Sequence, residues 1–494
     1  MATLNHLTLN GRFIGVESEY MYHFRGIPYG TVTQRFTNPV MKSTFDGEEV
    51  DCTRYGPRCP QIKLDIGYLL REPEGQIFHS ETEDEFACLN LDVAIPKTKR
   101  TYKLPVFLWV HGGSQIVSYG NGASKVGDVR KLVQSSVEQG SPMIVVSVQY
   151  RLNIFHVGDN PERKNFGLKD LQCAVRWVRD HIYGFGGDPD NITLAGESAG
   201  AALVHALIVA GADVRRALLM SGTLWMSPPR PHPMASSAVI EPITLRLHSQ
   251  GYTLQDAPAA ELIRIQSEIP IVSVFLQEAH ELADWATSTG KVSILMIGDC
   301  EFESAIFRNG IENLSAEQID VAFSKAGRSA EELKKLYHIN PTRPSSCRAG
   351  ALDLLNDIFW AIPTSKLKAQ VEDAGGLVFR YLFDQPNPWQ ASARAHHAVD
   401  LLHLFEGFTI SDPGALAVAK ELRRRLVLFV AGQPPWPTTR TCAFGSHGNV
   451  SEIGRDEVTT RRRVTEMERL AKMPAKDIAA ARAGLVVGTL SLHN

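Results

Sequence analysis

A chain of 494 residues, of which 44% are hydrophobic, can bury a large core and form one large sheet-based domain with insertions. Its formal net charge of −3 argues against nucleic acid or an anionic membrane surface as a partner, so we expect a small molecule. Its seven cysteines are scattered and include no Cys-x-x-Cys pair, which excludes a disulfide-built scaffold and indicates no zinc site.

The amino-terminal residues Met1–Asn10 lack the basic start, the apolar core and the small-residue cleavage site of a secretory leader. No run of the chain approaches the ~20 apolar residues that a membrane-spanning helix needs. We therefore expect a cytoplasmic protein without a membrane span, and the alternative is a secreted protein in its mature form.

The amino-terminal region has a strand-and-turn pattern. Gly11–Gly15 and Phe24–Tyr29 alternate like the two arms of a hairpin. Residues 51–85 are polar and have few periodic apolar positions, so we interpret them as an irregular insertion. A strand at Cys88–Val93 closes this insertion.

Short, continuous apolar runs next predict strands that are buried on both faces of a sheet. In chain order these runs are Val106–Val110, Ile144–Val148, Ile192–Glu197, Ala217–Met220, Val292–Ile297 and Leu377–Phe383. Apolar positions with helical spacing cover Gly167–Tyr183, between the second and third runs. Strands that alternate with helices predict an α/β fold with a large, mainly parallel sheet flanked by helices, and with functional groups beyond the carboxyl ends of the strands.

We expect a single domain over residues 1–494, with insertions at roughly 51–85, 250–289 and 311–359. The second and third insertions have helical patterns and are candidates to roof a pocket. Residues 457–485 are charged and predict solvated helices, and the run Arg461–Arg463 is interpreted as part of a surface face.

The sequence Gly-Glu-Ser-Ala-Gly at Gly196–Gly200 lies between an apolar strand and an alanine-rich helix. In that context it predicts a nucleophile elbow, a sharp strand-to-helix turn that presents a reactive serine. Glycines are needed at both flanks because larger side chains would collide with the neighbouring strand and helix. Ser198 is therefore the candidate nucleophile, and the amide of Ala199 points into the same space; the alternative is a serine that serves only the turn.

A serine hydroxyl is a weak nucleophile at neutral pH, so it needs a base within hydrogen-bond reach and an acid that orients the base. On a sheet of this kind, the acid and then the histidine follow the serine in the chain. The loop after the strand at Val292–Ile297 offers three candidate acids: Asp299, Glu301 and Glu303. Farther along the chain, His396 and His397 are the candidate bases, and they cannot both face the serine.

The segment His111–Ser114 follows a buried strand directly and contains two glycines. Glycines let the backbone approach a substrate carbonyl, so the amides of this segment can form an oxyanion hole together with the amide of Ala199. Each such donor contributes roughly 3 to 4 kcal/mol to lowering the barrier of acyl transfer.

Motifs along nearly the whole chain resemble those of the type-B carboxylesterases, the α/β-hydrolase family that includes cholinesterases, fungal lipases and the non-catalytic neuroligins. The motifs that carry the resemblance are Phe24–Tyr29, Cys88–Leu91, Trp109–Gly113, Tyr150–Asn153, Asn165–Asp170, Phe185–Pro189 and Gly196–Gly200. The resemblance is most specific between residues 165 and 201.

The resemblance implies which candidate takes each catalytic role. The acid-loop motif of the family is similar to residues 298–304 and selects Glu303, and its His-x-x-Asp/Glu-Leu motif selects His397, with Asp400. The oxyanion donors are then the amides of Gly113, Ser114 and Ala199, with Gly112 beside them. Two further residues are expected to support the triad without direct chemistry: Glu197, next to the nucleophile, and Ser221, beside the acid.

The chain departs from the family pattern at several places. Ser114–Gln115 stand where the family usually has a third glycine and an aromatic residue, so we expect a more polar pocket wall. Phe302 occupies an acidic place before Glu303, which leaves the acid itself intact. Cys59 and Cys88 resemble the pair that forms a disulfide in secreted relatives, and in a cytoplasmic protein we expect them to remain thiols.

The expected function is hydrolysis of a small to medium carboxylic ester through an acyl-enzyme, with no metal and no cofactor. Acyl transfer and lactone formation or opening are the alternatives with the same triad, and a catalytically silent binding protein is disfavoured because all three motifs are present. The polar character of residues 51–85 argues against an apolar lipase lid, and the region lacks the tryptophan segment of choline-ester enzymes. We expect the substrate pocket near Ile271–Trp285, Trp360 and Trp389.

Overall fold

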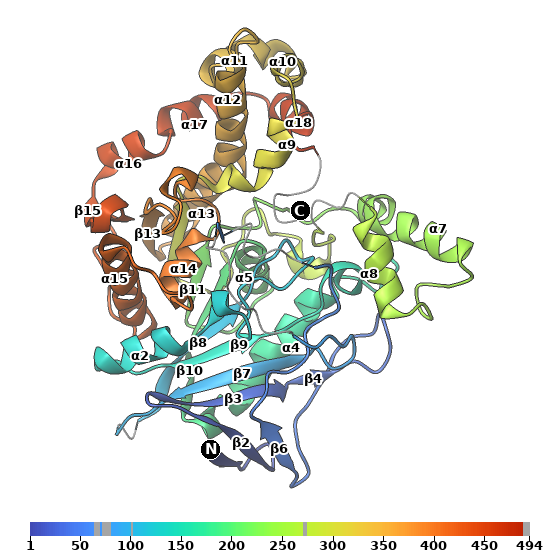
Figure 1. Cartoon of the computed structure of the whole chain (residues 1–494), viewed down its shortest axis with the longest axis vertical. Coiled ribbons are helices and arrows are strands. Elements are labelled where there is room, and N and C mark those ends of the chain that lie inside the picture. Colours follow the sequence, from blue (N-terminus) through green and yellow to red (C-terminus); the bar gives the residue numbers. More distant parts are fainter. Residues whose placement is uncertain (64–69, 72–80, 100–101, 270–273, 488–494) are drawn as a thin grey trace.

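The computed structural model describes residues 1–63, 70–71, 81–99, 102–269 and 274–487. Much of the insertion expected at 51–85 therefore lies outside the described residues. A twisted sheet occupies the centre of the molecule (Figure 1), helices α10, α11, α12 and α18 project at one end, and α7 and α8 lie at one side.

The sheet confirms the predicted α/β architecture. Its described strands follow the spatial order β1, β2, β3, β7, β9, β8, β10, β11, β12, β13, β14, β15. The pairs from β9 and β8 through to β14 are parallel, whereas the pairs toward both ends of this order are antiparallel. Strand β6 lies outside this order and pairs with β2 in parallel. The bounds are β1 Ala2–His6, β2 Gly11–Glu17, β3 Met21–Pro28, β4 Gly30–Thr31, β5 Val40–Met41, β6 Glu49–Cys52, β7 Asn90–Pro96, β8 Leu104–Val110, β9 Ile144–Val148, β10 Gly187–Glu197, β11 Arg216–Met220, β12 Ile294–Cys300, β13 Leu377–Phe383, β14 Thr441–Phe444 and β15 Val450–Ile453.

Helices cover both faces of this sheet. They are α2 Arg130–Glu138, α3 Asn153–Val157, α4 Phe166–His181, α5 Ala199–Val209, α6 His232–Ala235, α7 Glu241–Ser249, α8 Ala259–Ser267, α9 Arg308–Glu312, α10 Ala316–Ser324, α11 Ala330–Leu336, α12 Pro344–Asn356, α13 Ile362–Asp373, α14 Val399–Phe405, α15 Pro413–Val430, α16 Arg455–Arg461, α17 Val464–Leu470 and α18 Ala475–Ala483. The predicted helix at Gly167–Tyr183 corresponds to α4.

Strand β8 shows why its continuous apolar run is buried. Alternate side chains of a strand point to opposite faces of a sheet. Val106, Leu108 and Val110 accordingly belong to the core that contains α4 and α5, whereas Phe107 and Trp109 belong to the core that contains α2, α14 and α15. Both faces of β8 therefore require apolar residues, so the sequence of this strand does not alternate between apolar and polar residues.

The two helical insertions differ in how they are built. Residues 311–359 form a small helical layer of their own around α10, α11 and α12, with a separate apolar core. Residues 250–289 contribute α8, and its apolar residues join the core beneath α4 and α5.

The interpretation of Arg461–Arg463 as a surface face is wrong for its central residue. Arg462 is only 5% exposed, and its guanidinium pairs with Asp299 at 2.7 Å and with Asp384 at 2.8 Å. Two carboxylates compensate the buried charge, so the carboxyl-terminal segment is attached to the sheet.

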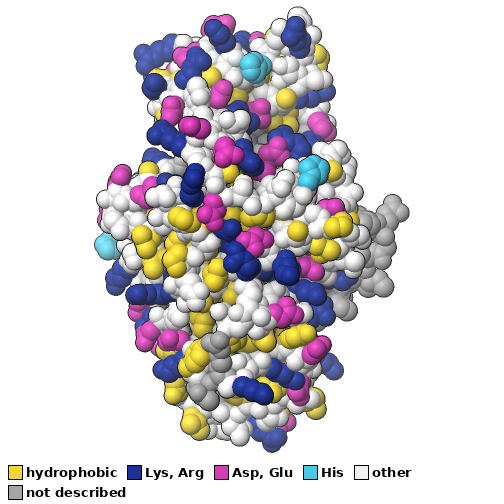
Figure 2. Space-filling view, turned by 90° about the vertical axis from the view of Figure 1, so that its left-hand side faces the viewer, with side chains coloured by type: hydrophobic (Ala, Val, Ile, Leu, Met, Phe, Trp, Pro, Cys, Tyr) yellow, Lys and Arg dark blue, Asp and Glu magenta, His cyan; other side chains and the backbone are white. Residues whose placement is uncertain are grey.

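The surface carries charges of both signs. On the face shown in Figure 2, Lys and Arg side chains are interspersed with Asp and Glu side chains, with small groups of hydrophobic side chains between them. Within the part of the chain that the structure describes, no helix combines the length and the apolar character needed to cross a membrane.

Candidate active site

Ser198 lies at the sharp turn between β10 and α5. Its backbone has a φ of 55° and a ψ of −121°, a left-handed conformation that residues with a side chain rarely adopt. The turn is held because the amide of Ser198 donates a hydrogen bond of 2.8 Å to the carbonyl of Met220. The serine side chain thus stands at the start of α5, as the elbow motif predicts.

The flanking glycines are required by close backbone packing. A Cβ at Gly196 would lie 2.6 Å from the carbonyl carbon of Gly200, and a Cβ at Gly200 would overlap the carbonyl oxygen of Val110. Gly112 approaches from the other side, where a Cβ would lie 2.6 Å from a carboxylate oxygen of Glu197. Glycine at these positions therefore lets the elbow and the loop after β8 come together.

The structure brings Ser198, His397 and Glu303 into one hydrogen-bonded chain. His397 Nε2 lies 2.8 Å from Ser198 Oγ, and His397 Nδ1 lies 2.5 Å from a carboxylate oxygen of Glu303. The other oxygen of Glu303 accepts a 2.6 Å hydrogen bond from the amide of Cys300. The carboxylate thus orients the imidazole, and the imidazole faces the hydroxyl.

The rejected candidates have other partners. Asp299 is buried and pairs with Arg380 and Arg462, whereas Glu301 forms a partly exposed ion pair with Arg394. His396 Nε2 lies 2.9 Å from the side-chain amide of Asn387. Only Glu303 and His397, among the expected acids and bases, are in line with the serine.

Two further buried carboxylates surround His397. Glu197 lies 3.3 Å from His397 Nε2, and burial raises the pKa of Glu197 to about 8. Burial likewise raises the pKa of Asp400, and so does the charge of Glu303. Burial alone would lower the pKa of His397, but the charges of Glu197 and Glu303 outweigh it and raise that pKa above the ordinary histidine value.

Ser221 lies beside the acid loop but does not bond to Glu303. Its hydroxyl contacts the Sγ of Cys300 at 3.8 Å, and its carbonyl accepts a 2.9 Å hydrogen bond from the indole of Trp360. The ring of Trp360 is 5.5 Å from the ring of His397, between centroids. Ser221 thus contacts Cys300 in the acid loop, and Trp360 packs against the ring of His397.

The loop after β8 has an unusual backbone. Gly113, Ser114 and Gln115 have φ values of 108°, 58° and 59°, so three consecutive residues are left-handed. Among the described residues, the amides of Gly113 and Ala199 have no hydrogen-bond acceptor. Amides without an internal acceptor are what an oxyanion hole requires.

Residues that sequence reasoning missed hold this loop in place. The amide of Asn153 donates to the carbonyl of Gln115 at 2.7 Å, and its side chain donates to the carbonyl of Pro60 at 2.8 Å. The side-chain oxygen of Gln61 accepts from the amide of Ser118 at 2.8 Å. Asn153 closes one of the motifs noted in the sequence, which is the only signal that could have pointed to it.

The expected pocket residues are only partly brought to the site. Trp360 is next to His397, whereas Trp389 packs against Phe408 with ring centroids 5.8 Å apart. Trp285 packs against Trp225 at 4.6 Å. Ile271 and its two neighbours lie outside the described residues.

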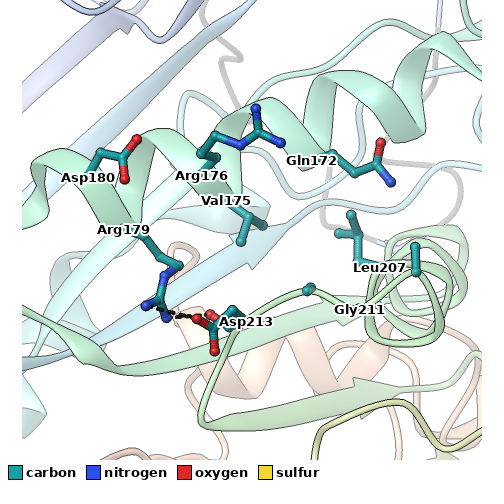
Figure 3. Close-up of a pocket in the computed structure, with 10 residues that line it drawn as sticks. Gln172, Val175, Arg176, Arg179, Asp180, Leu207, Gly211 and Asp213 are labelled. Atoms are coloured by element: carbon teal, nitrogen blue, oxygen red, sulfur yellow. Dashed lines mark hydrogen bonds and ion pairs between the residues drawn. The ribbon is translucent and has the colours of Figure 1, made fainter.

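A cavity of about 380 Å³ between α4 and the loop after α5 is separate from this site (Figure 3). It is lined by residues that include Arg176, Arg179 and Asp213, and Arg179 forms an ion pair with Asp213 at 2.9 Å. Ser198 precedes the first residue of α5, whereas this cavity adjoins the last, and eleven helical residues span about 16 Å. This cavity is therefore not where the serine acts.

The chain belongs to the carboxylesterase family, whose model matches residues 3–432. This places it among the carboxylic-ester hydrolases with an α/β-hydrolase fold, and a catalytic triad and an oxyanion hole are typical of that family.

Individual relatives agree with this class. The chain is 28% identical to Lipase 3 of Yarrowia lipolytica over 493 residues, which cover 94% of this chain and 96% of the relative. It is 34% identical to a secreted lipase of Arthroderma benhamiae over 197 residues, or 38% of this chain and 33% of the relative. The crystal structure of a Geobacillus stearothermophilus carboxylesterase shares the fold with a TM-score of 0.74, at 24% identity, over 93% of this chain and 99% of the other.

These relatives correct the expected location. The prediction of a cytoplasmic protein is wrong, because the relatives are lipases and one of them is a secreted lipase, which points to a secreted protein. The prediction rested on residues Met1–Asn10 alone, and the sequence of these residues does not determine the location.

Proposed function

We propose that this carboxylesterase-family protein hydrolyses a small to medium carboxylic ester with Ser198, His397 and Glu303 as its catalytic triad. The observation that carries the proposal is the continuous hydrogen-bonded chain from Ser198 Oγ through both nitrogens of His397 to Glu303. A hydroxyl, a base and an orienting acid in this order are the parts that acyl transfer through serine needs.

In the proposed reaction, His397 Nε2 takes the proton of Ser198 as Oγ attacks the ester carbonyl carbon. Glu303 fixes the tautomer of the imidazole and stabilises the imidazolium that forms. The negative charge on the carbonyl oxygen is held by the amides of Gly113, Ser114 and Ala199.

The intermediate collapses when His397 returns the proton to the leaving alcohol, which leaves an acyl group on Ser198. His397 then removes a proton from water, the hydroxide oxygen attacks the acyl carbon, and the carboxylic acid is released as Ser198 regains its proton. Every step uses side chains and amides of the described chain.

The test combines labelling with kinetics. Incubation with a fluorophosphonate followed by peptide mass spectrometry should place the adduct on Ser198. Hydrolysis of p-nitrophenyl acetate should fall by at least about 10³-fold in Ser198→Ala, with the melting temperature preserved. An adduct elsewhere, or an unchanged rate in Ser198→Ala, would overturn the proposal.

A further inference from the structure

A second cavity, of about 690 Å³, lies between α8, the segment Pro60–Lys63 and the loop after β8. Its volume is in the range of about 300–1,000 Å³ that holds small organic ligands. Helix α8 lies beside α7 on the right-hand side of Figure 1. Ile116 brings the loop after β8 to the cavity wall.

The apolar part of the lining is aliphatic. Its larger members are Ile62, Ile116, Ile263 and Ile269, and the smaller ones are Pro60, Ala259 and Ala260. Three of these side chains, Ile62, Ile263 and Ile269, pack against the main core but stay partly exposed. Aliphatic surface that remains exposed inside a concave site is favourable for binding a hydrocarbon chain.

Two buried amide groups give the same cavity a polar end. Gln61 and Gln266 line it, and they are 5% and 3% exposed. Among the described residues, neither side-chain nitrogen has a hydrogen-bond acceptor. Buried donors without a partner are rare in folded proteins, so an acceptor from a ligand would satisfy both.

Neighbouring donors fix how these two amides are turned. The Gln61 oxygen must face the amide and hydroxyl of Ser118, which lie 2.8 and 3.0 Å away. The Gln266 oxygen accepts from the amide of Ile154 at 3.4 Å. The side-chain NH₂ groups of Gln61 and Gln266 are therefore the donors that have no acceptor among the described residues.

A cation lies at the edge of the cavity. Lys63 is exposed and lines it, and within the described residues it forms no ion pair. The other cation of the lining, Arg264, is already paired with Glu261 and Glu268. Glu83 also lines the cavity, and its carboxylate is already paired with Arg58 at 2.9 Å. The polar groups that remain for a ligand are thus two neutral donors and one positive charge.

We propose that this cavity binds a medium-chain aliphatic carboxylate, with its hydrocarbon chain on the isoleucines and its carboxylate at Gln61, Gln266 and Lys63. The described lining of this cavity includes none of Ser198, Glu303 and His397, although Ile116 and Gln61 connect the cavity to the loop that carries Gly113. Such a carboxylate reaches the site either from solution or as the acid that ester hydrolysis releases.

The experiment measures equilibrium binding of decanoate and of 1-decanol by titration calorimetry, with the full-length protein. Gln266→Glu keeps the oxygen that Ile154 needs but replaces the donor by a negative charge. It should weaken decanoate binding by at least about tenfold and leave binding of 1-decanol unchanged. The matched control is Gln172→Glu in the cavity of Figure 3, which should bind decanoate as the unmodified protein does.

A further measurement tests whether decanoate binds at this cavity or at Ser198. Protein whose Ser198 has first been labelled with a fluorophosphonate should still bind decanoate, and Ile263→Trp, which fills the cavity, should abolish binding in the same labelled protein. Loss of decanoate binding on labelling, or equal affinity in Gln266→Glu and the unmodified protein, overturns the proposal. Because binding is the readout, this result is independent of whether Ser198 proves to be the nucleophile.

Discussion

Nε2 of His397 lies 2.8 Å from the hydroxyl of Ser198 and 3.3 Å from a carboxylate oxygen of Glu197. The same nitrogen that faces the candidate nucleophile therefore also faces a buried carboxyl group, whose pKa burial raises to about 8. Among the described residues, neither oxygen of Glu197 has a hydrogen-bond donor, so the protonated imidazole is its natural counter-charge.

This relationship predicts a pH effect. His397 acts as a base only when neutral, and the Glu197 charge raises its pKa by favouring the protonated form. Glu197→Gln should therefore lower that pKa and move the acidic limb of kcat/KM to lower pH by about one pH unit. Glu301→Gln, which changes an exposed ion pair, is the control and should not move the limb. A shift to higher pH would contradict the assignment.

The three acids of the loop after β12 should give three different phenotypes. Glu303→Gln should lower kcat by about 10³- to 10⁴-fold with little loss of stability, because it removes the acid that orients His397. Asp299→Asn should instead destabilise the fold by about 3 to 5 kcal/mol, because it leaves Arg380 and Arg462 buried with less compensation.

Glu301→Gln should change neither quantity, since its partner Arg394 is exposed. Steady-state kinetics and urea denaturation of the three variants check these outcomes. The assignment fails if Glu301→Gln is the variant that loses activity.

Gly200→Ala should be strongly disruptive. The new methyl group would overlap the carbonyl oxygen of Val110 and lie 2.6 Å from that of His111, so the elbow or β8 must shift. We expect a loss of about 3 kcal/mol in the free energy of unfolding. Gly454→Ala, whose Cβ would meet only the side chain of Arg440, is the matched control and should stay within about 1 kcal/mol.

Sequence patterns were sufficient for the sheet and the elbow because both are specified locally. Continuous apolar runs such as Ile144–Val148 match their strands, and Gly196 and Gly200 are dictated by backbone contacts within the turn. The prediction of His397 rather than His396 came from a family motif. The direction in which each of two adjacent side chains points depends on the local backbone conformation, and the sequence pattern does not specify that conformation.

Other features depended on contacts between distant segments and left no local pattern. Gln61 and Asn153 form hydrogen bonds to the loop after β8 from separate parts of the chain. Arg462 is buried because it pairs with Asp299, which is distant in the sequence, so the sequence around Arg462 does not distinguish it from a surface arginine. Ser221 was expected beside the acid, and its hydroxyl contacts the Sγ of Cys300, the residue whose amide donates to Glu303.

The corrected location bears on two cysteines. Cys59 and Cys88 are buried thiols, and a hydrogen bond with Cys59, together with burial, raises the pKa of Cys88 well above its ordinary value. In an oxidising compartment these neighbouring thiols should form a disulfide that closes the loop over residues 59–88.

Non-reducing peptide mass spectrometry of the protein expressed in an oxidising compartment should find that pair. Cys59→Ser should lower stability by about 3 kcal/mol relative to the oxidised protein. Cys347→Ser, which removes a buried thiol from the separate helical layer, is the control and should leave the 59–88 pair intact. Free thiols at both positions after secretion would refute the pairing.

The burial of Arg462 matters for any redesign of this enzyme. The family model stops at residue 432, yet this later guanidinium neutralises Asp299 on the strand that leads to Glu303. A fragment cut at the family boundary would keep Ser198, Glu303 and His397 and lose a counterion of Asp299, which lies four residues before Glu303. Expression fragments and fusion partners should therefore be planned around the carboxyl-terminal arm and not around the boundary that homology suggests.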